Sequence, residues 1–168
     1  MKLSLEGRRF IQALEMCRLE AYPDGKHKDG SDKWSIGWGH NGNDVKPGMK
    51  ITQAKADALF LEDVAWAEAA VIKNVTISLQ PNEFDALVCF VYNIGEPRFK
   101  TSTLLARLNA GDRAAAAHNF LRWNRYLGKI NAGLVKRRAA ERHRFLGFSV
   151  AASLKAGDQA HAVHTKRL

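Results

Sequence analysis

The segment from Pro81 to Gly95 constrains the fold more than any other part of the chain. Its apolar residues recur every three to four positions and form a nearly continuous stripe along one side of a helix: Phe84, Leu87, Val88, Val91 and Ile94. Gly95 follows the last of them, as glycine commonly does at the end of a helix. This pattern predicts the central helix of a helical core.

The polar stretch from Arg18 to Pro47 is of a different kind, because it is rich in Gly, Asp, Asn and Lys and holds two short aromatic or β-branched runs. It predicts a small β-hairpin with loops. Helical periodicity and capping residues predict further helices at Leu5–Cys17 after Ser4, Gln53–Ile72 after Thr52, Ser102–Ala110, Asp112–Trp123 and Leu134–Leu146. We expect the inward face of the helix after Thr52 to consist of Phe60, Val64, Ala67 and Val71.

These elements predict an α+β fold, in which a small N-terminal β-hairpin lobe is joined by a long helix to a larger all-helical lobe, with a cleft between them. The 168 residues, 46 % of them hydrophobic, are enough for one compact domain. We expect this domain to span residues 1–148. Residues 149–168 are rich in Ala, Lys and His with little apolar periodicity, and we expect a basic tail that is loosely attached or disordered.

The chain is basic, since 26 Lys and Arg face 17 Asp and Glu and the net charge is +9. Such a surface attracts polyanions, and nucleic acid, anionic membrane and bacterial cell wall all qualify. The uncharged runs are far shorter than the ~20 apolar residues of a membrane span. The N-terminal sequence MKLSLEGRRF has no apolar signal core, so we expect neither a stable membrane anchor nor export by the general secretory route.

Metal and disulfide signals are weak. Cys17 and Cys89 are far apart and show no CxxC spacing, so we expect buried free thiols. Asp24, Asp29 and Asp32 lack the alternate-residue ligands and closing Glu of an EF-hand, and the 6 histidines lack zinc-site spacing. We therefore expect no metal and no cofactor.

Glu15 and Asp24 are candidates for paired catalytic carboxylates. Glu15 stands near the end of a predicted helix and Asp24 in the turn-rich stretch after it, so both can face one cleft. Glycoside hydrolysis uses such a pair, because one carboxyl protonates the leaving oxygen while the other stays ionised and directs water or attacks the sugar. An apolar helix face should raise the pKa of the first, whereas a polar loop should not raise that of the second. Among 17 acidic residues, spacing alone does not single out this pair.

The surrounding residues do single it out. The run from Glu15 to Asp24 (EMCRLEAYPD) followed by Trp34 to His40 (WSIGWGH) resembles the signature of the phage-type lysozyme and endolysin family, glycoside hydrolase family 24. The resemblance extends from about Phe10 to Leu146. It includes Phe84–Val88 (FDALV), Tyr92–Gly95 (YNIG), Phe99, Ser102–Leu105 (STLL), the Gly111-Asp112 turn, Trp123 and Gly133–Glu141 (GLVKRRAAE).

This resemblance implies a lysozyme-like fold and hydrolysis of the β-1,4 bond between N-acetylmuramic acid and N-acetylglucosamine in peptidoglycan. By position, Glu15 is the general acid, and Asp24 is the carboxylate that positions or activates water. Ser35 supplies the hydroxyl where the family usually has Thr, so the methyl that fixes the rotamer is lost. The family reaction inverts the anomeric centre, which predicts carboxyl groups roughly 6.5–9.5 Å apart.

The same resemblance places Tyr92 and Ser102 among the residues that contact sugar, puts Ala117 at a contact position where it has no polar group, and gives His40 a role in holding the hairpin. Two alternatives stay open: Tyr92 is an aromatic residue of the core, and Ser102 is a helix cap. Arg137 or Arg138 either pairs with Glu15 or is a solvated helix charge. The sequence departs from the family pattern at Met16, where Gly is common, and in a longer loop between Asp24 and Ser35.

Several alternatives stay open. Glu20 also precedes Asp24 and rivals Glu15 for the acid role, although an exposed strand position suits it better. A lytic transglycosylase would cleave the same bond without water, and a basic nucleic-acid-binding protein would use the cationic helix Lys136–Arg144. We favour a monomeric lytic hydrolase that binds peptidoglycan and no nucleic acid. It should accumulate in the host cytoplasm and reach the wall after the membrane is permeabilised.

Overall fold

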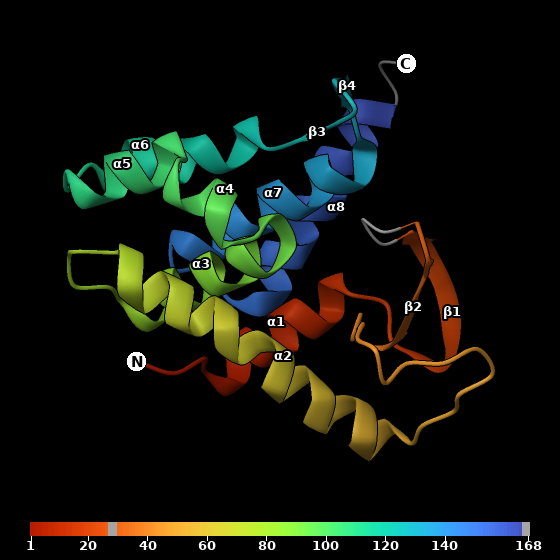
Figure 1. The fold of residues 1–168 in the computed structure, drawn as a ribbon. Helices are drawn as coiled ribbons and strands as arrows, with labels where there is room; N and C mark the ends of the chain where they lie inside the picture. The colour runs from red at the N-terminus through yellow and green to blue at the C-terminus, as the bar shows by residue number, and fades with distance from the viewer. Residues whose placement is uncertain (27–29, 166–168) are drawn as a thin grey trace. The chain divides into compact units, whose positions relative to one another are not determined.

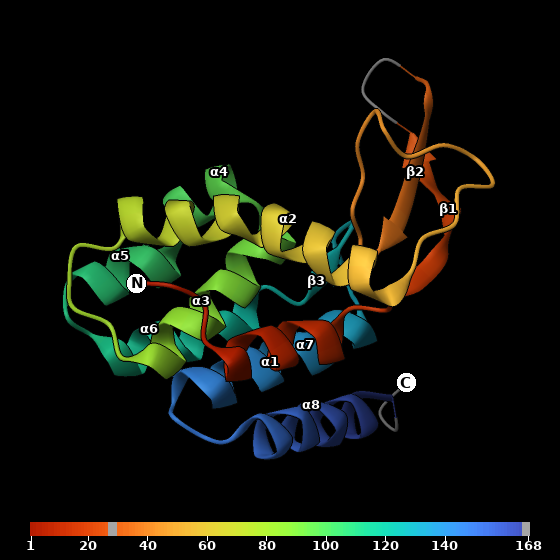
Figure 2. The same ribbon diagram turned by 90° about the horizontal axis from the view of Figure 1, so that it is seen from below.

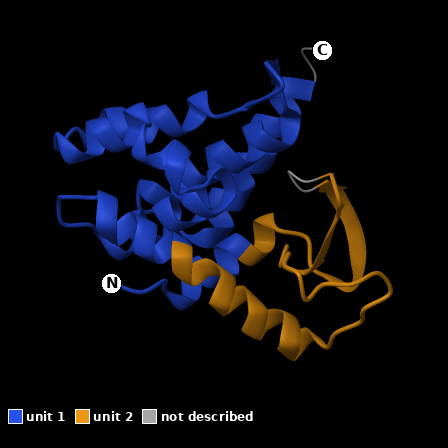
Figure 3. Cartoon of the chain, in the orientation of Figure 1, with its two compact units in different colours: residues 1–11, 67–168 blue, residues 12–66 orange. Residues whose placement is uncertain are grey.

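A computed structural model describes residues 1–26 and 30–165, most of which are helical (Figure 1). The chain divides into two compact units, one made of residues 12–66 and the other of residues 1–11 and 67–168 (Figure 3). The boundaries fall within two helices, α1 (Leu5–Leu14) and α2 (Gln53–Asn74). Helices together with short antiparallel strand pairs confirm the expected α+β class.

The smaller unit holds the expected β-hairpin. Strand β1 (Arg18–Lys26) pairs antiparallel with β2 (Asp32–Gly37). A small apolar cluster packs behind the strands and consists of Ala21, Ile36 and Val45, with Trp34, Met49 and Ile51 against them. The hairpin is therefore anchored by its own core. His27, Lys28 and Asp29, which include one of the aspartates considered above for calcium, lie outside the described residues.

The larger unit is built around α3 (Pro81–Ile94), as its apolar stripe predicts. Phe84, Leu87, Val88 and Val91 are at most 1 % exposed. Further helices of this unit follow it in the chain: α4 (Glu96–Lys100), α5 (Thr103–Asn109), α6 (Arg113–Asn119), the 3₁₀ turn η1 (Phe120–Arg122) and α7 (Ala132–Phe145). Phe90 lies at the centre, with Phe99, Phe120 and Trp123 packed edge-on against its ring.

Most expected helix starts are confirmed by hydrogen bonds. Ser4 Oγ accepts from Gly7 N at 2.9 Å, Thr52 Oγ1 from Lys55 N at 3.2 Å and Asp112 Oδ1 from Ala115 N at 2.9 Å. The first helix is shorter than expected, because it ends at Leu14 and not at Cys17. Leu5 was expected on its buried face but is 61 % exposed. Both cysteines are free thiols; Cys89 is buried as expected, but Cys17 is only half-buried because it lies beyond the helix end.

The C-terminal segment differs from the expected loose tail. Residues Val150–Thr165 form a helix, α8, which lies alongside α7 in both views (Figures 1 and 2). Its buried residues are small, namely Ser153 and Gly157, and a Cβ atom at Gly157 would come within 2.7 Å of the Lys136 carbonyl oxygen. The packing face therefore depends on small residues that allow close approach. A search for large apolar residues misses such a face.

A second hairpin was not expected from the sequence. Strands β3 (Arg125–Tyr126) and β4 (Lys129–Ile130) are joined by Leu127 and Gly128, which have φ angles of 49° and 77°. Two positive φ angles are the mark of a type I′ turn, which favours Asn-Gly and strains a residue such as Leu. Leu127 is 85 % exposed, so packing does not compensate for this strain.

We expect Leu127→Asn to raise the free energy of unfolding by about 1 kcal/mol, because Asn tolerates the left-handed conformation. Thermal and denaturant unfolding measure the change. Leu127→Ala is the matched control: it removes the same apolar side chain but keeps an L-residue that resists a positive φ, so it should bring no comparable gain. Equal stabilisation by both substitutions would contradict the strain argument.

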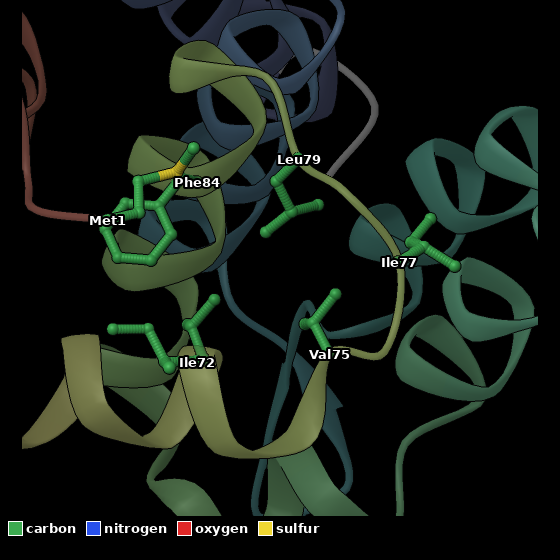
Figure 4. Close-up of a pocket in the computed structure, with 7 residues that line it drawn as sticks. Met1, Ile72, Val75, Ile77, Leu79 and Phe84 are labelled. Carbon is green, nitrogen blue, oxygen red and sulfur yellow. The ribbon is translucent and has the colours of Figure 1, made fainter.

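One pocket of the larger unit is apolar throughout. It has a volume of about 190 Å³ and is lined by side chains from the N-terminus, the end of α2, the following loop and α3 (Figure 4): Met1, Val71, Ile72, Val75, Ile77, Leu79 and Phe84. These side chains offer no group for acid–base chemistry. None of the helices in the described residues has the length and apolar character needed to cross a membrane.

Candidate active site

Asp24 and Ser35, which the sequence nominates together, are in direct contact. Ser35 Oγ donates a hydrogen bond of 2.8 Å to Asp24 Oδ2, and Lys33 Nζ lies 3.0 Å from the same oxygen. Ser35 is fully buried, whereas the Asp24 side chain is 44 % exposed. Burial acts to raise the pKa of Asp24, but the Ser35 hydrogen bond and the Lys33 ammonium outweigh it, and the pKa is lowered. Asp24 is thus an ionised, water-accessible carboxylate held by a buried hydroxyl.

Glu15 lies at the bend that directly follows α1 and is half-buried. Glu15 and Asp24 both affect the pKa of one residue, Tyr22. Burial raises the pKa of Tyr22, and the Asp24 and Glu15 carboxylates raise it further, while Arg18 and the Ser35 hydroxyl act to lower it. Both carboxylates therefore lie close enough to act on the same phenol, which stays protonated at neutral pH.

Sequence reasoning missed Tyr22, Arg18 and Lys33 as members of this group. The Arg18 guanidinium lies 4.5 Å from the centre of the Tyr22 ring, and Tyr22 pairs with Ser35 across the strands. Cross-strand partners share one face of a sheet. The strand run around Tyr22 was the available signal, but the register that places Ser35 opposite it was not visible.

Glu20 lies where the pairing of β1 with β2 is irregular. Arg18 pairs with Gly37 and Tyr22 with Ser35, so the register shifts between the two pairs. Bulges break the alternation of a strand and change the direction of its side chains. Glu20 instead forms a bridge with Lys50, whose Nζ is 3.3 Å from Glu20 Oε2, and its side chain is 62 % exposed. Its exposed position agrees with the simpler interpretation of Glu20.

His40 links the hairpin to α2. Its Nδ1 lies 2.9 Å from Asp63 Oδ1 and its Nε2 3.1 Å from Asp44 Oδ2, while its carbonyl oxygen accepts from Ile36 N at 2.8 Å. Burial acts to lower the pKa of His40, but the hydrogen bonds to Asp63 and Asp44 outweigh it, and the pKa is raised. The pKa of Asp44 is lowered, chiefly by its hydrogen bond to His40. The imidazolium therefore holds two carboxylates together.

This arrangement predicts a pH-dependent contribution to stability. Because the pKa of His40 is higher in the folded protein than in the unfolded chain, the contribution is fully present below the unfolded value of about 6.5 and disappears as pH rises through the folded value. Unfolding free energies of wild type and His40→Asn should differ by about 1–2 kcal/mol near pH 6 and by less near pH 9. A difference that grows with pH would contradict the assignment of a protonated His40.

Tyr92 and Ser102 belong to the larger unit. Tyr92 is half-buried in the last turn of α3. Ser102 caps α5 by accepting from Leu105 N at 3.1 Å, and it also lines a pocket of about 340 Å³ with Thr101, Thr103, Asn119, Arg122 and Trp123. Because a hydroxyl accepts and donates at once, the capping bond leaves the Ser102 proton available to a ligand. Ala117, the other contact position that the resemblance implied, is buried and 2 % exposed.

Three of the four arginines of α7 are buried and are not solvated helix charges. Arg137, Arg138 and Arg144 are 7 %, 0 % and 9 % exposed. Arg137 and Arg138 bind Glu141, and Arg144 Nη2 lies 2.8 Å from Asp85 Oδ2. Phosphate binding needs exposed cations, so these three arginines do not contribute to the cationic face that a nucleic-acid-binding protein would use.

The described residues contain no group of three or more His, Cys, Asp or Glu side chains placed to hold a metal ion. What the group around Asp24 can do chemically follows from its own side chains. A carboxylate with a lowered pKa, a buried hydroxyl and a nearby second carboxyl are suited to general acid–base chemistry on a substrate with water.

Comparison with known proteins identifies the family. The phage lysozyme family profile matches residues 12–141, which include Glu15, Asp24 and Ser35. The chain belongs to the phage lysozyme family. The endolysin of Salmonella phage P22 is 38 % identical over 150 residues, which cover 87 % of this chain and 99 % of that protein.

Two further similarities concern chain length and fold. The endolysin of Bacillus phage B103 is 42 % identical over 146 residues, which cover 87 % of this chain and 54 % of that protein, so the chain spans about half of its length. The muramidase domain of SpmX from Asticaccaulis excentricus superposes with a TM-score of 0.78 at 35 % identity and covers 88 % of this chain and 99 % of that domain. This superposition confirms the lysozyme-like fold class.

The Asp24–Ser35 contact makes a prediction for this family member. Ser35→Ala removes the hydroxyl that lowers the pKa of Asp24, so the acid limb of the pH–activity profile should move to higher pH. In an assay of the lytic activity proposed below, we expect the rate at neutral pH to fall by roughly tenfold to a hundredfold, because the carboxylate is less firmly placed. Ser35→Thr keeps the hydroxyl and adds the methyl that restricts its rotamer, so it should retain activity and the wild-type acid limb.

Proposed function

We propose that this protein is an endolysin that hydrolyses the β-1,4 bond between N-acetylmuramic acid and N-acetylglucosamine in bacterial peptidoglycan. The observation that carries the proposal is the hydrogen bond from the buried Ser35 hydroxyl to Asp24, in a chain of the phage lysozyme family. The net charge of +9 supports adsorption to an anionic wall.

In the proposed reaction Glu15 donates its proton to the glycosidic oxygen as the bond to the anomeric carbon breaks. Asp24 accepts a proton from water while the water oxygen bonds to the anomeric carbon, so one water molecule is consumed and both sugar ends are completed. The lowered pKa of Asp24 suits this role, because a base must be ionised before it acts. Attack of water on the opposite face inverts the anomeric centre. Tyr92 and Ser102 are proposed to contact sugar, and no metal or cofactor takes part.

Product analysis tests the proposal. Purified Gram-negative peptidoglycan is digested with the wild-type protein, and the fragments are analysed by mass spectrometry. Reducing muramic acid ends are expected, with one oxygen from H₂¹⁸O incorporated in each new end. Anhydro-muramic ends without the label would instead show a lytic transglycosylase. Lysis assays use permeabilised cells, because we also propose that the enzyme reaches the wall only after the membrane is breached.

A further inference from the structure

Asp57, in the second turn of α2, collects side-chain hydrogen bonds from three segments of the smaller unit. Its Oδ1 atom accepts from Trp38 Nε1 at 2.7 Å, from Gln53 Nε2 at 3.0 Å and from Gln12 Nε2 at 3.2 Å. Hydrogen bonds to an ionised acceptor are the stronger kind. No pattern in the sequence singles out this aspartate.

Two of these donors lie next to the proposed catalytic residues. Gln12 belongs to the last turn of α1, immediately before the bend at Glu15. Trp38 follows Gly37, the last residue of β2, which is the strand that carries Ser35. Asp57 therefore joins the segment of the proposed acid to the strand whose hydroxyl holds the proposed base.

Gln53 extends this connection to the other side of Glu15. Its Oε1 lies 3.8 Å from Cys17 Sγ, while its Nε2 donates to Asp57 Oδ1. The chain is thus tethered before Glu15 by Gln12 and after it by Cys17, and both tethers end at the same pair of residues on α2. A bend fixed on both sides has few ways to relax.

We propose that Asp57 is a positioning residue of the active site, which holds the Glu15 bend and the Ser35 strand in register through Gln12 and Trp38. The inference rests on the proposed function. Its physical basis is that displacement of a catalytic group by about 1 Å can reduce a rate by about a hundredfold. Asp57 itself touches no reacting atom in this role.

The test compares Asp57→Ala with Asp63→Ala. Both residues are aspartates of α2 that hold a ring nitrogen of the hairpin region, Trp38 Nε1 and His40 Nδ1 respectively, but only Asp57 is bonded to a residue beside Glu15. Steady-state rates on soluble glycan fragments are measured well below each melting temperature. We expect kcat to fall roughly tenfold to a hundredfold for Asp57→Ala, with KM within about twofold of wild type. For Asp63→Ala we expect kcat to stay within about twofold.

Asp57→Asn supplies the rescue, because its amide oxygen still accepts from Trp38, and it should recover part of the lost kcat. An equal loss of kcat in both alanine variants, a change confined to KM, or an unchanged kcat in Asp57→Ala would each overturn the inference. If Asp57→Ala does not fold, Trp38→Phe and Gln12→Leu remove single tethers, and unchanged kcat in both would overturn it likewise. An inactive wild type would instead refute the proposed function.

Discussion

Glu15→Gln is expected to lower wall lysis by about a thousandfold, because an amide cannot donate the proton that the leaving glycosidic oxygen needs. Gln is close to Glu in size, and Glu15 is only half-buried at the bend after α1, so the fold should survive. The measurement is the loss of turbidity of permeabilised Gram-negative cells, with circular dichroism to establish that the variant is folded.

Glu20→Gln is the matched control for this experiment. It makes the same chemical change in the same short segment, at a side chain that is 62 % exposed and paired with Lys50 rather than with the group around Asp24. Exposed ion pairs contribute little, so both stability and lysis should stay near wild type. If Glu20→Gln is the inactive variant and Glu15→Gln lyses cells, the assignment of the acid is wrong.

Glu141→Ala is expected to lower the free energy of unfolding by about 3–5 kcal/mol, because it removes the carboxylate that two buried arginines bind. Glu141 is fully buried and accepts from Arg137 Nε at 3.0 Å and from Arg138 Nη1 at 2.6 Å. Arg138 is also fully buried, with its guanidinium 4.9 Å from the centre of the Phe90 ring and bonded to Asn93. Burial lowers the pKa of Arg138, and Glu141 acts against that shift.

Thermal unfolding measures the effect, and a decrease in Tm of about 6–20 °C is expected for a chain of this size. Glu6→Ala is the control, because the Glu6–Arg9 pair also joins a carboxylate to a guanidinium but is exposed on both sides. It should change stability by no more than about 1 kcal/mol. Similar losses in the two variants would contradict the view that burial, not pairing alone, makes Glu141 important.

Local sequence patterns correctly predicted the elements that depend on periodicity or on helix capping. The apolar stripe from Phe84 to Val91 predicted a buried central helix, and the capping residues Ser4, Thr52 and Asp112 predicted where helices begin. These features depend on neighbours in the chain, and periodicity and backbone capping report them directly. The pair of Asp24 and Ser35 came from the sequence as well, through its likeness to a family signature.

Elements that depend on distant partners were missed. Helix α8 packs through Ser153 and Gly157 against α7, and only the closeness of that helix explains why small residues suffice. The sequence left Arg137 and Arg138 open between a pair with Glu15 and a solvated charge. It did not indicate Glu141 as their partner, or Asp85 as the partner of Arg144, because burial of these carboxylates cannot be recognised from the sequence.

At the candidate site, the residue types can be predicted from the sequence: a glutamate near the end of a helix, an aspartate in a hairpin and a hydroxyl on the returning strand. Which of them meet depends on the folded chain. Strand register placed Tyr22 opposite Ser35, Glu20 paired with Lys50, and Asp57 gathered three donors onto one oxygen. Register and convergence arise from pairing between remote segments, so no local pattern in the sequence specifies them.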